Sequence, residues 1–411
     1  MTQLSSETLL KAAKKYKTPL FIYNGDLILE RYNDFFKFIR LKKMNSRKSN
    51  LRILYAMKAN YNPEILKLLK KQGAWLDLVS PGEAVLALKL GFRKEHLLFT
   101  ENNMTNEEMH KIRKLGILIN IGSLSRLEKF GKTYPKSEVC IRFNPDVIAG
   151  EHEKVITGGD LTKFGILLSD LDQVKNIVKR YKLKVVGLHE HTGSGISDMN
   201  KVFQSIQNLM NIATRENFPK LKFLDFGGGF KVQYHPQEIR VNYAEFGLKV
   251  SRMFEKFCRK YGRTLDLYFE PGKYIVAESV YLIVEVNTLK KNKSRLIAGT
   301  NSGFNHLIRP VLYNAYHHIT NLSNPDGKIR KYDIVGNICE TGDTFASDRK
   351  IPEIREYDLL AIHNAGAYCY SMGSLYNLRP MPAEFLYANG NLKMVSKRMS
   401  EEELIEKIFK D

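Results

Sequence analysis

Residues Leu51-Arg52-Ile53-Leu54-Tyr55-Ala56-Met57-Lys58-Ala59-Asn60 decide the fold, because they join an apolar strand to an ionisable side chain at its end. The run 51–57 is typical of a buried strand. A lysine at the end of such a strand is costly to desolvate unless its charge or its proton is used. One use is an imine with an aldehyde cofactor, since a desolvated lysine loses its proton readily. The simpler interpretation is a lysine that reaches out to solvent.

Apolar strands alternate with amphipathic helical segments around this stretch. Helical spacing of apolar residues is found at 62–71, 82–90, 106–115 and 242–261. An alternation of this kind predicts an α/β fold, a (β/α)8 TIM barrel, and an open doubly wound sheet is the alternative. The eight predicted strands are 51–57, 75–79, 97–100, 117–121, 139–143, 185–189, 223–226 and 265–269.

Polar motifs follow six of these strands, as a barrel requires, because the loops after the strands build its active face. The motifs begin at Lys58, Ser80, Arg142, His189, Gly227 and Glu270.

From about residue 274 the sequence pattern changes to short strands, rich in β-branched residues and separated by turn residues. A second, all-β domain (sandwich-like or barrel-like) is therefore predicted, with almost no helix after residue 274 until 401–409. The apolar strand at 20–23, which follows a short helical start, is expected to join it. The predicted domains are a cofactor-binding barrel at 34–273 and a discontinuous β-domain made of 1–33 and 274–411. The strands predicted in the β-domain are 276–289, 295–298, 331–335, 358–362 and 384–387.

The composition is that of a soluble globular protein of 411 residues, with 43% hydrophobic and 26% charged residues. No apolar run approaches the roughly 20 residues of a membrane span, and residues 1–17 lack the apolar core of a secretory signal. Four scattered cysteines indicate neither a disulfide framework nor a zinc site, so a reducing cytoplasm is expected. The net charge of +20 is spread along the chain without a basic tail, which argues against nucleic-acid binding and is compatible with an anionic ligand.

Two motifs at strand ends suggest a cofactor. Gly227-Gly228-Gly229 follows the seventh strand, where backbone N–H groups can converge on a phosphate, although a tight turn would also explain three glycines. Glu270 ends the eighth strand, where a carboxylate could pair with a protonated ring nitrogen. A salt bridge from Glu270 to Lys273 or an arginine is the alternative.

His189 and His191 alternate along the sixth strand, so both are expected to face the barrel mouth. As a metal pair they lack a third ligand, and no metal is predicted. One imidazole could stack on an aromatic ring, and a satisfied core histidine is the simpler interpretation of either.

The predicted β-domain holds further candidates. In Cys339-Glu340-Thr341-Gly342-Asp343 the thiol could donate a proton, the neighbouring glutamate keeping it protonated, although most cysteines are buried small hydrophobes. Arg309, with Tyr313 nearby, offers a guanidinium for a carboxylate. Tyr368 offers a hydroxyl for a phosphate or a substrate.

Together these motifs resemble the fold-type III pyridoxal-phosphate decarboxylases, and within them the diaminopimelate decarboxylases, from about residue 18 to about residue 388. The resemblance implies pyridoxal 5′-phosphate as cofactor and the decarboxylation of meso-2,6-diaminopimelate to L-lysine and CO2, the final step of lysine biosynthesis. The motifs, in order, are 55–60, 189–194, 227–229, 270–272, 307–313, 339–343, 366–368, 376–377 and 382–384.

The resemblance also implies roles. Lys58 would hold the cofactor as an imine, His191 would stack on its ring and Glu270 would keep the ring nitrogen protonated. The other cofactor-binding residues would be Ser194, Gly227, Gly228, Gly229, Gly272, Lys273 and Tyr368.

On the substrate side, the resemblance makes Arg309 and Tyr313 ligands of a carboxylate, and Glu340 the ligand of the distal amino group. Lys273 and Tyr368 would also contact the substrate, and Cys339 would return a proton to Cα. In this family Cys339 and Glu340 come from the partner subunit, so a homodimer with shared active sites is expected.

One position departs from the family pattern: Lys273 stands where arginine is usual, which keeps the charge but loses the two-pronged geometry. The loop 146–163 is a candidate lid. Other possibilities remain open: a decarboxylase of ornithine, lysine, arginine or carboxynorspermidine, a racemase, or a silent homologue that acts as a binding partner. The presence of both Lys58 and Cys339 disfavours the silent homologue.

Overall fold

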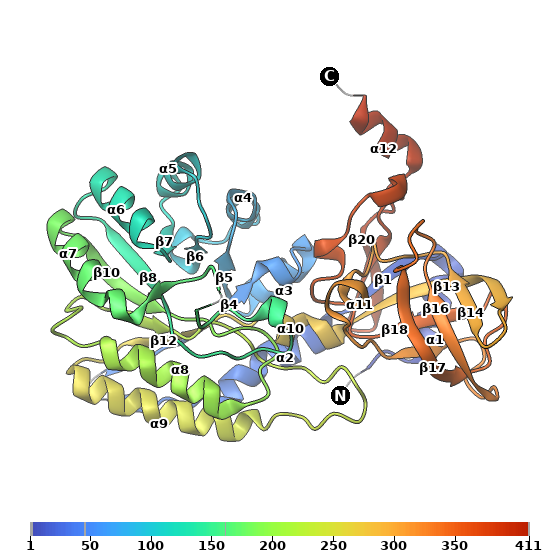
Figure 1. Ribbon diagram of the computed structural model, residues 1–411, viewed down its shortest axis with the longest axis horizontal. Helices are drawn as coiled ribbons and strands as arrows, with labels where there is room; N and C mark the ends of the chain where they lie inside the picture. Colours follow the sequence, from blue (N-terminus) through green and yellow to red (C-terminus); the bar gives the residue numbers. More distant parts are fainter. Residues whose placement is uncertain (1–2, 45–46, 161, 410–411) are drawn as a thin grey trace. The chain divides into compact units, whose positions relative to one another are not determined.

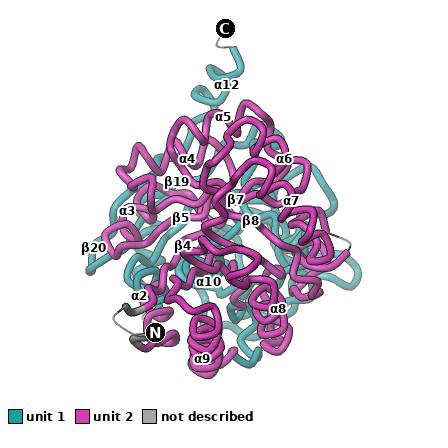
Figure 2. Tube along the Cα trace, turned by 90° about the vertical axis from the view of Figure 1, so that its left-hand side faces the viewer, with its two compact units in different colours: residues 1–31, 232–240, 273–411 teal, residues 32–231, 241–272 magenta. Residues whose placement is uncertain are grey.

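The computed structural model describes residues 3–44, 47–160 and 162–409, which form two compact units (Figures 1 and 2). The barrel unit comprises Tyr32–Lys231 and Val241–Gly272. The β unit comprises Met1–Arg31, Val232–Arg240 and Lys273–Asp411. Residues 232–240 thus lie in the β unit, whereas the sequence placed them in the barrel. In the described part of the chain, no helix combines the length and the apolar character needed to cross a membrane.

Eight parallel strands of the described chain close into a barrel, because β10 pairs with β8 as well as with β11. The prediction of a (β/α)8 barrel is confirmed, and an open sheet is excluded. A short ninth strand, β9 (Ile166–Leu167), extends from β8. The barrel strands are β4 (Leu51–Ala56), β5 (Trp75–Leu78), β6 (Leu97–Thr100), β7 (Leu118–Ile121), β8 (Glu138–Asn144), β10 (Lys184–His189), β11 (Phe223–Asp225) and β12 (Asp266–Phe269).

Helices surround these strands (Figure 1), and most begin at a residue whose side chain caps the first turn. Asn62 and Ser80 cap helices that begin with proline, while Thr105 forms a full capping box. The helices are α2 (Gly25–Phe38), which crosses from the β unit into the barrel unit, α3 (Pro63–Lys71), α4 (Pro81–Lys89), α5 (Asn106–Lys114), α6 (Leu124–Thr133), α7 (Leu171–Tyr181), α8 (Met199–Ile212) and α9 (Tyr243–Tyr261).

The β unit contains a nine-stranded mixed sheet, and β1 (Leu20–Asn24) lies inside it. This strand pairs antiparallel with β13 (Val280–Lys291) and parallel with β19 (Ala383–Ala388), which confirms that the N-terminal strand joins this sheet. The other strands are β14 (Leu296–Thr300), β15 (Ile319–Asn321), β16 (Ile329–Val335), β17 (Thr344–Pro352), β18 (Leu359–Ile362) and β20 (Asn391–Ser396).

The second domain is built on a β-sheet, as predicted, but the start of one predicted strand needs a correction. Val276 lies in a helix, α10 (Lys273–Val276), and the strand predicted from residue 276 begins only at Val280. Because Lys273–Val276 are all buried, no alternation of polar residues marks the change from helix to strand. In the described residues this unit also contains α1 (Ser6–Tyr16), which is the short helical start expected from the sequence, and α12 (Glu401–Ile408), which was predicted at 401–409. A further helix, α11 (Arg309–Tyr313), was not predicted.

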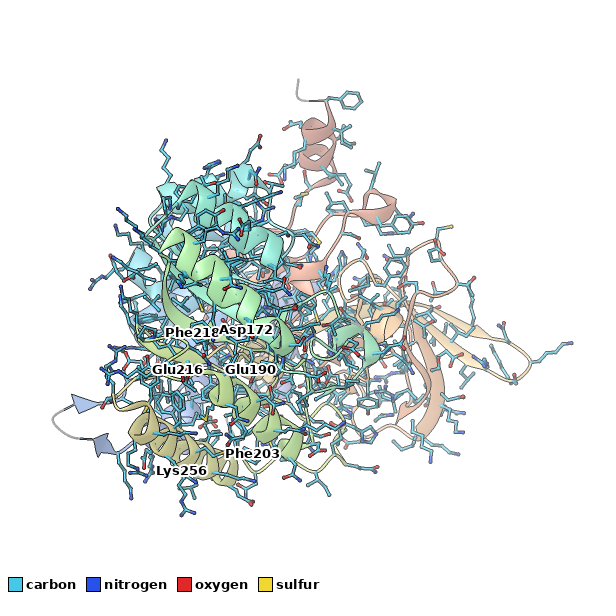
Figure 3. The ribbon with its side chains drawn as sticks, turned by 60° about the vertical axis from the view of Figure 1, so that its left-hand side comes forward. Asp172, Glu190, Phe203, Glu216, Phe218 and Lys256 are labelled. Atoms are coloured by element: carbon cyan, nitrogen blue, oxygen red, sulfur yellow. The ribbon has the colours of Figure 1, made fainter. Side chains whose placement is uncertain are left out.

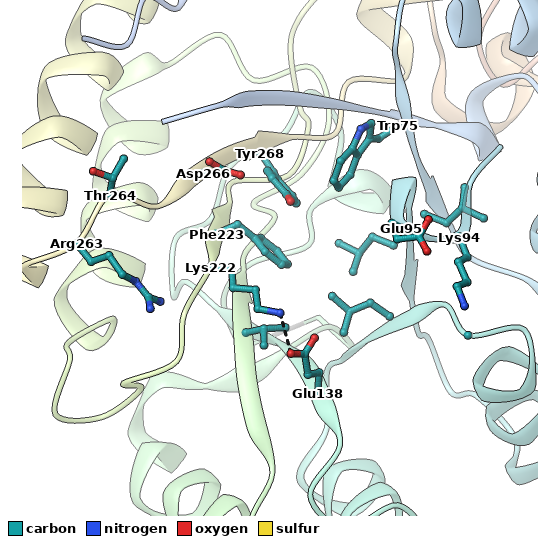
Figure 4. A pocket seen from close by; sticks show the side chains of 15 residues that line it. Trp75, Lys94, Glu95, Glu138, Lys222, Phe223, Arg263, Thr264, Asp266 and Tyr268 are labelled. Carbon is teal, nitrogen blue, oxygen red and sulfur yellow. Dashed lines mark hydrogen bonds and ion pairs between the residues drawn. The ribbon is translucent and has the colours of Figure 1, made fainter. Parts of the chain in front are cut away.

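A cavity of about 540 Å³ opens at the amino ends of the barrel strands (Figure 4). Trp75, Leu97 and Phe223, which line it, are the first residues of their strands. On its wall the Lys222 ammonium pairs with the Glu138 carboxylate at 2.7 Å. This cavity is therefore at the opposite end of the barrel from Lys58.

Candidate active site

Lys58 lies in a short 3₁₀ turn, Met57–Ala59, directly after β4. Its Nζ is 3.1 Å from Oδ2 of Asp77, a residue of the neighbouring strand β5. The lysine side chain is 38% exposed, whereas that of Asp77 is fully buried. Burial raises the pKa of Asp77, with Glu270 adding to the rise and Lys58 opposing it. Lys58 is therefore held in place by an ion pair and remains accessible to a reactant.

Glu270 follows β12, and its carboxylate is buried. Oε2 lies 3.0 Å from Nε2 of His189, and Oε1 has no hydrogen-bond partner within the described residues. Burial raises the pKa of this carboxyl group, while the positive charges of Lys58 and Arg142 oppose the rise. A buried carboxylate oxygen without a partner fits a protonated ring nitrogen as its missing donor. The partner found for Glu270 is His189, and not the lysine or arginine of the alternative interpretation.

The two histidines do not share a strand as expected, because β10 ends at His189 and His191 lies beyond it. Nδ1 of His191 accepts a hydrogen bond from the backbone N–H of Gly228 at 3.2 Å, which assigns the ring proton to Nε2. Desolvation, together with the positive charges of Arg142 and Lys58, holds the pKa of His191 well below its usual value. A neutral imidazole of fixed orientation is suited to stacking on a flat ring.

The three glycines after β11 are required by close packing. A Cβ atom on Gly228 would lie 2.5 Å from the carbonyl oxygen of Glu270, and one on Gly227 would lie 2.7 Å from that of Glu190. Gly227 and Gly229 also have φ values of +61° and +94°, which favour glycine. The triple glycine therefore lets the ends of β10, β11 and β12 converge.

Gly272 has the same function on the other side of Glu270. A Cβ atom there would lie 2.9 Å from the Cβ of Ala59, and the Ala56 N–H donates to the carbonyl of Pro271. The Glu270-Pro271-Gly272 turn therefore packs directly against the turn that carries Lys58.

The candidate lid, residues 146–163, is bonded to the loop after β10. The Thr157 hydroxyl donates to the His191 carbonyl at 2.7 Å, and the Ser194 N–H donates to the carbonyl of Val155 at 3.2 Å. At its base, the Asn144 side chain exchanges two hydrogen bonds with the backbone of Gly159. In its described part, this loop is thus attached to the segment that contains His191 and Ser194. Residue 161 lies outside the described residues.

Arg309 and Lys273 flank one aromatic ring in the β unit. The guanidinium carbon of Arg309 lies 4.4 Å from the centre of the Tyr234 ring, and Nζ of Lys273 lies 5.9 Å from it. Burial lowers the pKa of His317 to about 3, so its ring is neutral. Nδ1 of His317 faces the carbonyl of His363 and must donate, which leaves Nε2 to accept from Nη1 of Arg309 at 3.2 Å. The hydrogen bond to His317 therefore fixes the orientation of the Arg309 guanidinium.

Cys339 and Glu340 occupy an exposed turn of the same unit. The Cys339 N–H donates to Oδ1 of Asn377 at 2.8 Å, and the Tyr376 hydroxyl donates to Glu340 at 3.0 Å. The alternative interpretation of Cys339 as a buried small hydrophobe is therefore wrong, whereas Cys140, Cys258 and Cys369 are buried. Tyr313 and Tyr368, also in this unit, are half-buried.

Sequence reasoning did not include three charged residues at the barrel mouth among its site residues. Asp77, Arg142 and Asp225 are all buried next to Glu270. The available signal was a charged residue within each apolar strand, since an isolated charge is rarely buried without a function or a partner.

Comparison with known proteins is consistent with this geometry. Residues 37–277 match the family model described as "Pyridoxal-dependent decarboxylase, pyridoxal binding domain". The chain is 38% identical to diaminopimelate decarboxylase of Methanothermobacter thermautotrophicus, over 96% of this chain and 92% of that protein. It is 31% identical to the diaminopimelate decarboxylase of Escherichia coli K12, over 98% of this chain and 97% of that protein.

A solved structure of diaminopimelate decarboxylase from Helicobacter pylori, complexed with L-lysine, is also similar, with a TM-score of 0.86 and 32% identity over 98% of this chain and 99% of that one. The description of the family model names pyridoxal as the bound group, and the Glu270 oxygen without a partner and the glycine-lined turn fit pyridoxal phosphate. The chain belongs to the pyridoxal-dependent decarboxylase family.

Proposed function

We propose that the protein decarboxylates meso-2,6-diaminopimelate to L-lysine and CO2, the last step of lysine biosynthesis. The observation that carries the choice of substrate is the buried Arg309, whose guanidinium is oriented by His317. A guanidinium binds a carboxylate through two parallel hydrogen bonds. Only a substrate that keeps a second carboxylate after losing CO2 makes use of it, as diaminopimelate does.

In this proposal residues of the barrel unit hold the cofactor, and the β unit adds Lys273 and Tyr368. Pyridoxal phosphate, when bound, takes up the electron pair that is left as CO2 departs. Lys58 binds its aldehyde carbon, Glu270 keeps its ring nitrogen protonated and His191 covers one face of the ring. Its phosphate is received by Ser194, Gly227, Gly228, Gly229 and Tyr368, while Gly272 and Lys273 line the site.

Cys339 and Glu340 complete the site from a second subunit of a homodimer. Cys339 supplies the proton that Cα takes up, Glu340 binds the distal amino group, and Tyr313 supports Arg309 at the carboxylate. Exposed apolar side chains beside this turn support an interface there, since Tyr376 is 44% and Leu378 is 58% exposed.

A thiol that donates a proton must stay reduced, which favours the cytoplasm. The partners in this proposal are the amino-acid substrate and a second copy of the chain, without nucleic acid or membrane.

The decisive assay supplies the protein and pyridoxal phosphate, in parallel, with meso-diaminopimelate, L-lysine, L-ornithine and L-arginine. CO2 release and product identity are followed. Lysine formed from diaminopimelate alone supports the proposal. CO2 from another of these amino acids moves the protein to the alternative substrate class, and no CO2 from any of them contradicts both.

Arg309→Ala should lower kcat/KM for diaminopimelate by about 10²–10³-fold, because it removes one partner of a buried charged pair. Steady-state kinetics measures the effect, and Arg330→Ala, which changes an exposed arginine of β16 in the same unit, is the matched control. Nearly intact activity in Arg309→Ala would indicate a substrate without a distal carboxylate.

Mixing two inactive variants should restore activity if the sites are shared between subunits. Lys58→Ala and Cys339→Ala, unfolded together and refolded, should regain about a quarter of wild-type sites, because half of the dimers then hold one complete site. The activity of the mixture against each variant refolded alone measures this. No recovery would place Cys339 and Lys58 of one site on the same chain.

A further inference from the structure

We infer that Asp225 is a positioning residue that shares one proton with Glu270 in the cofactor-free protein, and that this proton passes to the ring nitrogen of pyridoxal phosphate on binding. The inference rests on the proposed contact between Glu270 and that nitrogen. No other reactant is needed, since the proton leaves a carboxyl group and arrives on the ring.

The barrel brings these groups together at the ends of three adjacent strands. Asp225 ends β11, in register with His189 of β10 on one side and Tyr268 of β12 on the other. One polar atom from each of His189, Asp225 and Glu270 lies within 4.8 Å of the others, and all three residues are buried. The Asp225 and Glu270 carboxyl groups are therefore neighbours in a site that excludes water.

Hydrogen bonding fixes one oxygen of each carboxyl group and leaves the other available. Oδ1 of Asp225 accepts the Gly227 N–H at 2.9 Å, and Oε2 of Glu270 faces His189. Oδ2 of Asp225 and Oε1 of Glu270 have no separate hydrogen-bond partner among the described residues. A proton held between the two carboxyl groups would satisfy both.

The surrounding charges do not allow both carboxyl groups to ionise. Burial, followed by the charge of Glu270, holds the pKa of Asp225 well above its usual value. Two buried carboxylates at this separation retain one proton between them. Lys58 is already paired with Asp77. The groups that face the pair are Lys58 beside β4, Asp77 on β5, Cys140 and Arg142 on β8, and His189 and Glu190 at the end of β10, with His189 kept neutral by burial.

The test counts the protons exchanged when pyridoxal phosphate binds the cofactor-free protein. Calorimetry in buffers of different ionisation enthalpy gives this number for the wild type and for Asp225→Asn. The asparagine keeps the acceptor for Gly227 but leaves Glu270 alone and ionised, so the ring proton must come from solvent. Asp225→Asn should therefore take up about one proton per site more than the wild type. Equal proton counts overturn the inference.

Glu190→Gln is the matched control, because it removes another buried carboxyl group, which lies directly after the neighbouring strand β10. Glu190 is labelled in Figure 3. Burial raises the pKa of Glu190 to about 8, yet Glu190 is not one of the three residues whose polar atoms converge. This variant should keep the wild-type proton count. A shift in Glu190→Gln as large as that in Asp225→Asn would overturn the assignment to Asp225.

Infrared spectroscopy of the wild type gives an independent readout if Asp225→Asn fails to fold. The carbonyl band of a protonated carboxyl group should be present without cofactor and lost on binding, and Glu190→Gln should show the same loss. An unchanged band overturns the inference, as does a stoichiometric metal ion on His189, Asp225 and Glu270 in the purified protein. Failure to bind pyridoxal phosphate at all, with no visible absorption, would instead contradict the proposed function.

Discussion

Lys58→Arg should fold like the wild type and yet release CO2 about 10³-fold more slowly or worse. Arginine keeps a positive charge beside the buried Asp77 carboxylate, but its guanidinium stays protonated and cannot attack an aldehyde. The visible absorption of the bound cofactor should change as the covalent link is lost. CO2 release, the absorption spectrum and thermal unfolding measure the three effects.

Lys58→Ala removes both the amine and the positive charge beside Asp77, so comparison with Lys58→Arg distinguishes the effect of the charge from that of the amine. It should lose activity to the same extent and also unfold at a lower temperature, because the buried Asp77 is left without its partner. Lys89→Ala, at the last turn of α4, is the control and should match the wild type in both respects. Activity within tenfold of the wild type in Lys58→Arg would exclude a covalent role for this lysine.

Glu270→Gln should lower kcat by about 10²–10⁴-fold while pyridoxal phosphate still binds through Lys58. The amide can still accept a hydrogen bond from His189, but it carries no charge to keep a ring nitrogen protonated. Glu138→Gln, at the opposite end of the barrel, changes the same type of side chain and should have no effect. A normal kcat in Glu270→Gln would show that the ring nitrogen is not paired with this residue.

The same variant should alter the dependence of stability on pH. The pKa of Glu270 is raised in the folded protein, so the folded state holds its proton more tightly than the unfolded state. Stability of the cofactor-free wild type therefore falls as pH rises from the unfolded pKa, near 4, through the folded value. Glu270→Gln removes one such group, and thermal unfolding between pH 5 and pH 8 should show a smaller decrease than in the wild type.

The barrel could be predicted closely because each of its strands is a short apolar run that ends in polar residues. The predicted strand 97–100 coincides with β6, and the strand predicted at 51–57 ends one residue too late, since Met57 begins the turn of Lys58. In the β unit the prediction of a strand from residue 276 was wrong, because Val276 belongs to α10. All residues of α10 are buried, so no polar positions distinguish this helix from a strand.

The position of the candidate site was predictable from the sequence, but the contacts between its side chains were not. Lys58 and Glu270 were recognisable as polar residues at strand ends. The Lys58–Asp77 ion pair depends on Asp77 lying opposite Ala56 in adjacent strands, and the His189–Glu270 contact depends on the closure of the barrel. Register and closure are properties of the assembled sheet, which one sequence does not display.

The place of β1 inside its sheet affects how the chain folds during synthesis. This strand is synthesised before the barrel unit, whereas its neighbours β13 and β19 are synthesised after it. The residues of the barrel unit emerge in between, and domains generally fold as units in the order of their synthesis. The residues of β1, all buried in the folded protein, therefore lack one or both of their neighbouring strands until β19 has been synthesised. Nascent chains arrested before β19 should consequently be the ones that require a chaperone.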